Sequence, residues 1–136
     1  KLSLKDGIEV RNCMKAWGDF KRDYEPKIQA VQVEVKDEEK KLIGHIDLVM
    51  NNRVVDVKCA SSIKDNYWLQ VAQYENMYYE PALFGLAILR LDKNLATYQF
   101  MTHEQAKISP AQCRKVFDGL LEAHRFYHAP KEQEGI

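Results

Sequence analysis

GHIDLVMNNRVVDVK, residues 44–58, reads as two β-strands joined by Asn51-Asn52, and it places an aspartate on each strand. Asparagine tolerates the positive φ angles that a two-residue hairpin turn requires. If these two residues form the turn, Asp47 lies directly opposite Asp56. The stretch therefore predicts an antiparallel hairpin that carries two facing carboxylates.

Alternate residues of a strand share a face, so this register assigns every residue of the hairpin to one of the two faces of the sheet. One face is expected to carry His45, Asp47, Val49, Val54, Asp56 and Lys58, and the other Ile46, Leu48, Met50, Val55 and Val57. Opposed aspartates would have Cβ atoms about 5 Å apart and would repel by roughly 3 kcal/mol at an effective dielectric constant near 20. A divalent cation with oxygen ligands would offset that repulsion. The alternative is an exposed polar face with an ordinary surface lysine.

Composition and length bound the class of protein. The chain has 136 residues, of which 46% are hydrophobic, and its formal net charge is zero, so we expect a single domain over residues 1–136. Cys13, Cys59 and Cys113 are far apart and include no C-x-x-C pair, which favours a reducing compartment and argues against a zinc or iron–sulfur site. No apolar run has membrane-spanning length and no signal peptide is present, so an intracellular, cytoplasmic protein is expected.

Hydrophobic periodicity and turn residues predict eight elements in the order α-β-β-β-α-β-β-α. The predicted helices are 6–24, 66–79 and 109–128, and the predicted strands are 28–35, 42–50, 53–60, 83–91 and 95–101. Pro81 is expected to end the second helix. Ile8, Met14, Trp17 and Phe20 recur at helical spacing and are expected to form the inner face of the first helix. The pattern indicates an α/β domain with a central mixed sheet.

Three further residues join the hairpin as candidates. Glu34 lies on the polar side of the preceding strand and can share a face with Asp47; the alternative is an exposed strand glutamate. Gln70 and Tyr74 are four residues apart, so they lie on one face of the second helix. The alternative for Tyr74 is a core aromatic with Gln70 as a bystander.

Taken together, these motifs resemble the PD-(D/E)xK nuclease superfamily. The residues that carry the resemblance are Glu34, Gly44-His45-Ile46-Asp47, Asp56-Val57-Lys58 and Gln70-x-x-x-Tyr74. The closer resemblance is to the RecB-type branch, and within it to phage and mitochondrial genome-maintenance exonucleases. It implies a restriction-endonuclease-like core and a metal-dependent deoxyribonuclease that hydrolyses DNA from ends.

The resemblance also implies roles for individual residues. Asp47, Asp56 and the backbone carbonyl of Val57 would bind Mg²⁺ or Mn²⁺, and Glu34 occupies a position that is often acidic and catalytic. Lys58 would orient the attacking water or stabilise charge on the phosphate. Gln70 and Tyr74 would contact the substrate strand, and His45 is a further candidate to contact metal or phosphate. No iron–sulfur cluster is expected, because the branch members that hold one use four cysteines.

The chain departs from the family at its start. The branch carries a histidine or glutamate on an upstream helix that completes the metal shell, and the first helix here resembles the segment after that motif. Glu9, Asp19 and Asp23 are candidates for the missing ligand. Otherwise the ligand lies before Lys1, comes from a protein partner or second subunit, or is absent.

The expected partner is DNA, single- or double-stranded, and no membrane; a phage or virus is a plausible source. Tyr67 and Trp68 are candidates to stack on splayed bases, although Trp68 also suits a core position. Three alternatives to an exonuclease stay open. They are a structure-specific endonuclease of the same superfamily, a subunit of a larger nuclease complex, and a non-catalytic nucleic-acid-binding module.

Overall fold

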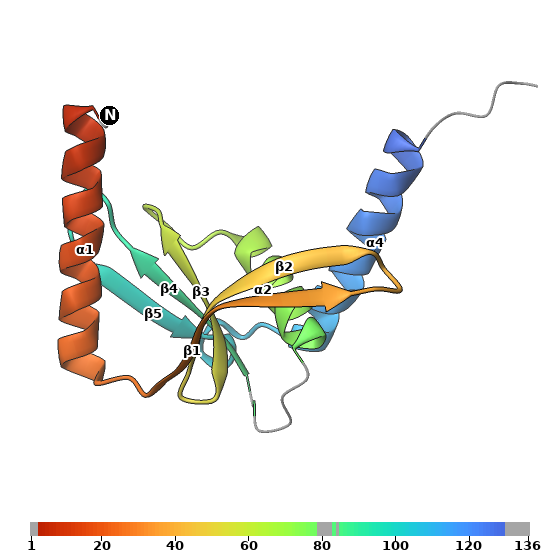
Figure 1. The fold of residues 1–136 in the computed structure, drawn as a ribbon, viewed down its shortest axis with the longest axis horizontal. Coiled ribbons are helices and arrows are strands. Elements are labelled where there is room, and N and C mark those ends of the chain that lie inside the picture. The colour runs from red at the N-terminus through yellow and green to blue at the C-terminus, as the bar shows by residue number, and fades with distance from the viewer. Residues whose placement is uncertain (1–2, 79–82, 84, 130–136) are drawn as a thin grey trace, which may run out of the picture.

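The protein was analysed as a computed structural model, which describes residues 3–78, 83 and 85–129. Within these residues, five strands form one mixed sheet that is flanked by helices (Figure 1). The elements are α1 (Leu4–Tyr24), β1 (Ile28–Asp37), β2 (Leu42–Met50), β3 (Arg53–Cys59), α2 (Asp65–Met77), β4 (Gly85–Leu91), β5 (Tyr98–Thr102), α3 (His103–Ala106) and α4 (Pro110–His128).

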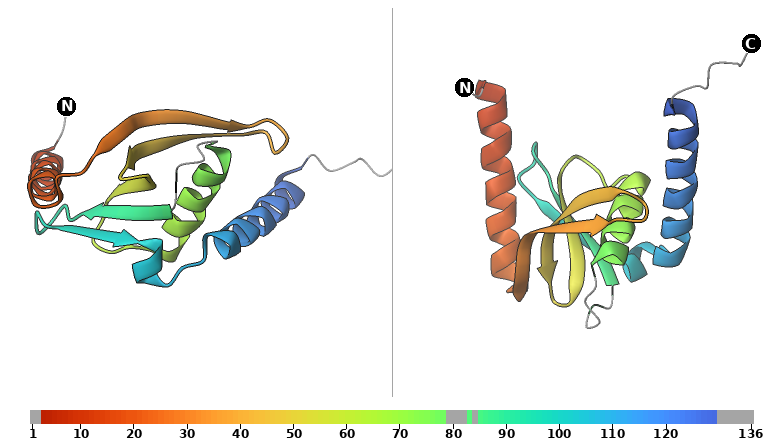
Figure 2. Two further views of the ribbon diagram at one scale, coloured as in Figure 1. Left: turned by 90° about the horizontal axis from the view of Figure 1, so that it is seen from below. Right: turned by 45° about the vertical axis from the view of Figure 1, so that its right-hand side comes forward.

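The strands lie side by side in chain order, β1-β2-β3-β4-β5. The β3–β4 pair is parallel, because α2 crosses over between them, and the other pairs are antiparallel. Helix α4 packs against α2, whereas α1 stands at the other end of the molecule, beside β4 and β5 (Figures 1 and 2). The predicted α/β class with a mixed sheet is confirmed.

The element boundaries differ from the predicted ones by up to three residues, and one helix was not predicted. A short helix, α3, lies between β5 and α4, and it begins at a capping box in which Thr102 and Gln105 bond each other's backbone amides. This T-x-x-Q signal was readable in the sequence and was missed. Pro81, the predicted stop of α2, lies outside the described residues, and α2 ends at Met77.

The predicted hairpin register between β2 and β3 is confirmed where the ladder forms. Leu48 pairs with Val55, Val49 with Val54 and Met50 with Arg53. The turn residues Asn51 and Asn52 have φ angles of 50° and 60°, as a two-residue hairpin turn demands. The ladder stops at Leu48, so Asp47 and Asp56 lie just beyond its last pair.

The predicted sorting of faces is wrong for part of β2. Ile46 packs in the same core cluster as Val49, although three positions separate them, so the alternation breaks between them. The next residues, Asp47 and Leu48, both line the cavity on the α1 side. A strand that breaks its alternation at Asp47 puts His45 and Ile46 on the faces opposite to those a regular strand would give them.

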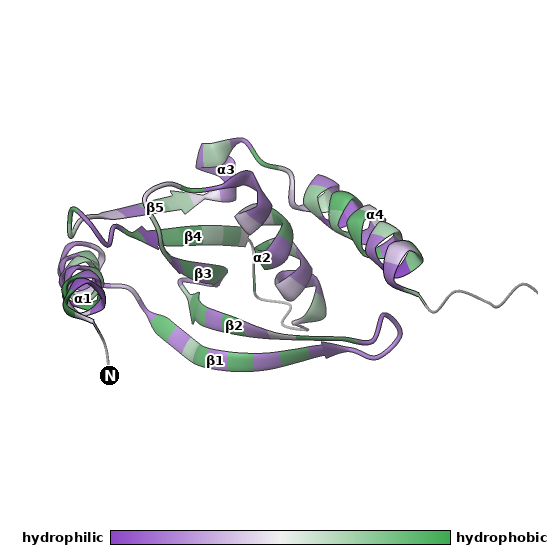
Figure 3. Ribbon diagram, turned by 90° about the horizontal axis from the view of Figure 1, so that it is seen from above, coloured by the Kyte–Doolittle hydropathy of each residue, from purple (hydrophilic) through white to green (hydrophobic). Residues whose placement is uncertain are grey.

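Two apolar clusters hold the sheet between its helices. On the α2 side, Trp68 and Val71 pack with Val54 and Ile88, and on the α1 side Phe20 packs with Leu89. Figure 3 shows β4 as a mostly hydrophobic strand, and it lies between β3 and β5 in the sheet. Trp68 is only 3% exposed, so it is a core residue and cannot stack on a base.

Helix α1 contacts the sheet through a face that runs from Cys13 to Phe20, and Phe20 packs on Tyr98 and Phe100 of β5. The predicted inner face of this helix is wrong at Ile8 and Met14, which are 46% and 63% exposed. The periodicity was real, but the N-terminal half of α1 has no neighbouring element to cover that stripe within the described residues. Among these residues, no helix is both long enough and apolar enough to cross a bilayer.

Candidate active site

The buried carboxylate of Asp56 is the centre of the candidate site. Its residue is 6% exposed, and within the described residues its Oδ2 accepts no hydrogen bond. The pKa of Asp56 is raised from its ordinary value to about 7, chiefly by burial and also by nearby Asp47, and against the lowering effect of nearby Lys58. A carboxyl group in this environment releases its proton to solvent when a cation binds and offsets the negative charge.

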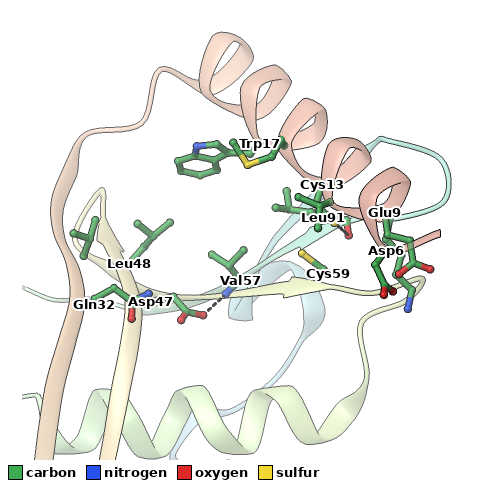
Figure 4. Close-up of a pocket in the computed structure, with 14 residues that line it drawn as sticks. Asp6, Glu9, Cys13, Trp17, Gln32, Asp47, Leu48, Val57, Cys59 and Leu91 are labelled. Atoms are coloured by element: carbon green, nitrogen blue, oxygen red, sulfur yellow. Dashed lines mark hydrogen bonds between the residues drawn. The ribbon is translucent and has the colours of Figure 1, made fainter. Parts of the chain in front are cut away.

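Asp47 lies against β3 at the point where the ladder with β2 ends. Its Oδ2 accepts a hydrogen bond of 2.9 Å from the backbone amide of Val57, drawn as a dashed line in Figure 4. The side chain thereby replaces the ladder bond that the diverging strands no longer make. It also places the carboxyl of Asp47 close enough to Asp56 to raise the pKa of the latter. The two carboxyls are therefore near each other, although Asp47 and Asp56 are not a pair of the β2–β3 ladder.

Lys58 joins this carboxylate pair to α2. Its Nζ lies 3.2 Å from Oδ2 of Asp56 and donates a hydrogen bond of 3.1 Å to Oε1 of Gln70. The same ammonium lies 5.1 Å from the centroid of the Tyr67 ring, within the range of a cation–π contact. Three partners from two elements therefore hold the lysine beside the carboxylates.

Gln70 and Tyr74 extend the network along α2. Gln70 Nε2 donates a hydrogen bond of 2.9 Å to Oη of Tyr74, so the amide is fixed from both ends. The ring of Tyr74 lies over Gly44 of β2: a Cβ built on this glycine would stand 2.3 Å from Cε1 of the tyrosine. The glycine of the GHID stretch is needed because the tyrosine occupies the space of a side chain.

Glu34 and His45 do not join the site. They pair across β1 and β2, with Oε2 of Glu34 3.7 Å from Nε2 of His45, and both side chains are more than half exposed. Gly44 faces Tyr74 and Ile46 packs against the α2-side core, so His45 between them points to the other face from Lys58. The predicted pairing of His45 with Lys58 is wrong for this reason.

The charged groups that come together are therefore Asp47, Asp56 and Lys58. Across the described residues, no group of three or more histidine, cysteine, aspartate and glutamate side chains is close enough to hold a metal ion. Of the upstream candidates, Asp19 and Asp23 bond Lys15, Arg22 and Tyr98 near the far end of α1. Glu9 lines a cavity that Asp47 also lines.

That cavity, of about 880 Å³, lies between α1 and the sheet. Its lining is mostly apolar, with Met14 and Trp17 on α1 and Leu48 on β2, and Asp47 stands at its floor (Figure 4). It was not predicted from the sequence. Of the helix residues that the sequence predicts for the core, Met14 and Trp17 line this cavity and Ile8 does not.

No protein-family model matches the chain, and no curated protein sequence matches it.

Proposed function

We propose that this chain is a metal-dependent DNA nuclease of the PD-(D/E)xK type that hydrolyses phosphodiester bonds from DNA ends. The observation that supports it best is the buried carboxylate of Asp56, which lies beside Asp47, has Lys58 as its ion-pair partner and accepts no hydrogen bond at Oδ2 from the described residues. A structural hairpin gains nothing from this arrangement, since burying a second carboxylate beside the first costs free energy. A site that binds a cation and a phosphate would use all three charges.

Asp47, Asp56 and the backbone carbonyl of Val57 are the groups that would hold Mg²⁺ or Mn²⁺. The residues fit such an ion, because Asp56 Oδ2 accepts no hydrogen bond within the described residues beyond its ion pair with Lys58, and one oxygen of Asp47 remains after the bond to Val57. Magnesium sites commonly use one or two carboxylates and leave the other positions to water and substrate phosphate. When bound, the ion supplies positive charge at the phosphoryl oxygens and makes water more acidic.

Lys58 supplies the positive charge that belongs to the protein itself. Asp56 and Gln70 fix its Nζ, so the ammonium needs no rearrangement when a phosphate arrives. A prepositioned charge of this kind stabilises the negative charge that builds on the phosphate oxygens during hydrolysis. The same ammonium can donate a hydrogen bond to a water molecule beside Asp56 and orient it.

Gln70 and Tyr74 position Lys58 from the α2 side of the sheet. The chain of contacts runs from Tyr74 through Gln70 to the lysine, and Tyr74 is in turn seated on Gly44. The backbone of β2 thus supports the lysine of β3 through α2. We assign these two residues to orienting the site and the substrate strand.

A second candidate is a nucleic-acid-binding module that does not cleave. It is favoured by one observation: within the described residues only two acidic side chains meet at the site, and Glu34 is not one of them. Such a module would bind DNA with an affinity that does not depend on the metal.

The test uses linear and covalently closed circular DNA, each single- and double-stranded, with Mg²⁺, Mn²⁺ or EDTA. The proposal expects linear DNA to be degraded in either metal, circular DNA to resist, and EDTA to stop the reaction. Cleavage of circular DNA would indicate an endonuclease of the same superfamily. Binding without cleavage in any metal would favour the non-catalytic module.

A further inference from the structure

A cavity of about 450 Å³ opens on the other side of Lys58, between α2 and α4. Flat or apolar side chains form much of its lining, among them Tyr67 of α2 and Phe117 and Leu120 of α4. Polar groups from Asn66, Gln70 and His124 reach the same space. A concave apolar site with a few convergent polar groups is typical of a small planar ligand.

This cavity is continuous with the candidate active site. Lys58 and Gln70 line it and also contact each other beside Asp56. Tyr67, whose ring lies 5.1 Å from the lysine ammonium, forms its border with the active site. A group bound in the cavity therefore lies next to whatever phosphate Lys58 contacts.

Packing among the described residues leaves part of the α4 wall uncovered. Leu120 is 56% exposed although it lines the cavity, and His124 is exposed as well. An apolar side chain at the mouth of a pocket next to a phosphate site can be covered by the substrate. The charge-bearing side of the nucleotide would lie at Lys58 and its apolar side at α4.

We infer that this cavity binds one unpaired nucleobase of the nucleotide next to the scissile phosphate. This inference rests on the proposed function and narrows its substrate. A base in a duplex has its faces stacked and its pairing edge occupied, so only an unpaired base can enter a side pocket. The active site therefore takes DNA that is single-stranded, or frayed, at the point of cleavage.

The experiment measures binding separately from cleavage. Full-length protein with Asp56→Asn is titrated in EDTA with a fluorescent single-stranded oligothymidylate, and with an all-abasic strand of equal length and equal phosphate number. Both strands offer the same charge, so a difference in affinity reports contacts to bases. Stacking on one aromatic side chain predicts that the abasic strand binds roughly tenfold more weakly.

Two substitutions on α4 locate that difference. Leu120→Glu puts a charge in the mouth of the cavity, and Val116→Glu makes the same change one turn earlier on the helix, at a residue that does not line it. Both side chains are at least 40% exposed, so the fold should tolerate either change, which thermal melting checks. Leu120→Glu should abolish the preference for the base-carrying strand, and Val116→Glu should keep it.

A second pair of variants tests the aromatic ring. Tyr67→Phe should retain the preference and Tyr67→Leu should reduce it several-fold. Equal affinity for the two strands, no binding to either, or equal effects of the two α4 variants would overturn the inference. Metal-dependent cleavage without base preference would support the nuclease proposal and overturn the base-binding inference. Base preference without cleavage would support a base-binding cavity and contradict the nuclease proposal.

Discussion

The carboxylate of Asp47 and the backbone amide of Val57 are joined by a hydrogen bond of 2.9 Å across the end of the β2–β3 ladder. This contact fixes the carboxyl group of Asp47 beside the buried Asp56, and the negative charge of Asp47 helps to raise the pKa of Asp56. The site is thus built where two strands diverge, because a side chain takes the place of a backbone partner there.

Asp47→Asn should stabilise the metal-free protein. Asparagine keeps an oxygen that accepts the Val57 amide and removes the charge that Asp56 faces, so we expect a gain of about 1 kcal/mol in the free energy of unfolding. Asp47→Ala is the matched control, because it also removes the charge but loses the hydrogen bond. Thermal melting in EDTA should rank Asn above both Ala and wild type. If the Asn variant melts at a lower temperature than wild type, Asp47 and Asp56 do not repel each other in the metal-free protein.

The stability of the metal-free protein should depend on the protonation of Asp56. Its pKa is raised by burial from an ordinary value of 3.8 to about 7 in the folded protein. The neutral form is therefore the one that the fold favours, so the stabilisation is complete below about pH 4 and is lost as the pH rises through 7. The difference in melting temperature between wild type and Asp56→Asn, measured from pH 4 to 8, isolates this group. Wild type should lose stability relative to the variant as the pH rises. A difference in melting temperature that stays constant with pH would contradict a raised pKa of Asp56.

Gly44→Ala should destabilise the protein and disturb the site. The new Cβ would lie 2.3 Å from Cε1 of Tyr74, so the ring must move, at a cost of about 1–3 kcal/mol. Moving the ring also breaks its bond to Gln70, which holds Lys58. Gly18→Ala in α1 is a control with the opposite expected sign, since a Cβ there meets nothing within 4 Å and alanine favours helix by about 1 kcal/mol. Chemical denaturation measures the free energy of unfolding of both variants. If the two substitutions change it equally, the ring of Tyr74 does not lie over Gly44.

Lys58→Ala should abolish cleavage and leave metal binding largely intact. The ammonium does not ligate a cation, but it faces Asp56 at 3.2 Å and stands where a phosphate would bind. Calorimetric titration with Mn²⁺ and a cleavage assay on the same preparation separate the two functions. If both are lost together, Lys58 serves the fold of the site rather than the reaction.

The hairpin register was readable from the sequence because one turn signal, Asn51-Asn52, fixed it, and this register places Asp47 and Asp56 just beyond the last pair of the ladder. The orientation of His45 was not readable, since it depends on a break in alternation at Asp47 that no residue type announces. The exposure of Ile8 and Met14 was not readable either: periodicity shows which residues share a helix face but not whether another element covers it.

The packing of one helix against another was also not predictable from sequence patterns. Leu120 reads as an ordinary core position of an amphipathic helix, and only the placement of α4 against α2 makes it a wall of the cavity beside Lys58. Tyr67 was identified from its chemistry as a stacking candidate, and the core position that the sequence favours for its neighbour Trp68 is confirmed by the burial of the tryptophan.

The most direct test of the account compares cleavage of linear DNA in Mn²⁺ by wild type, Asp56→Asn and Asp118→Asn. Asp118 is an exposed aspartate on α4 that pairs with Lys40, so its substitution controls for the loss of one negative charge. The account predicts that wild type and Asp118→Asn degrade the DNA at similar rates and that Asp56→Asn is slower by at least a hundredfold. Equal cleavage by all three proteins would contradict a site centred on Asp56.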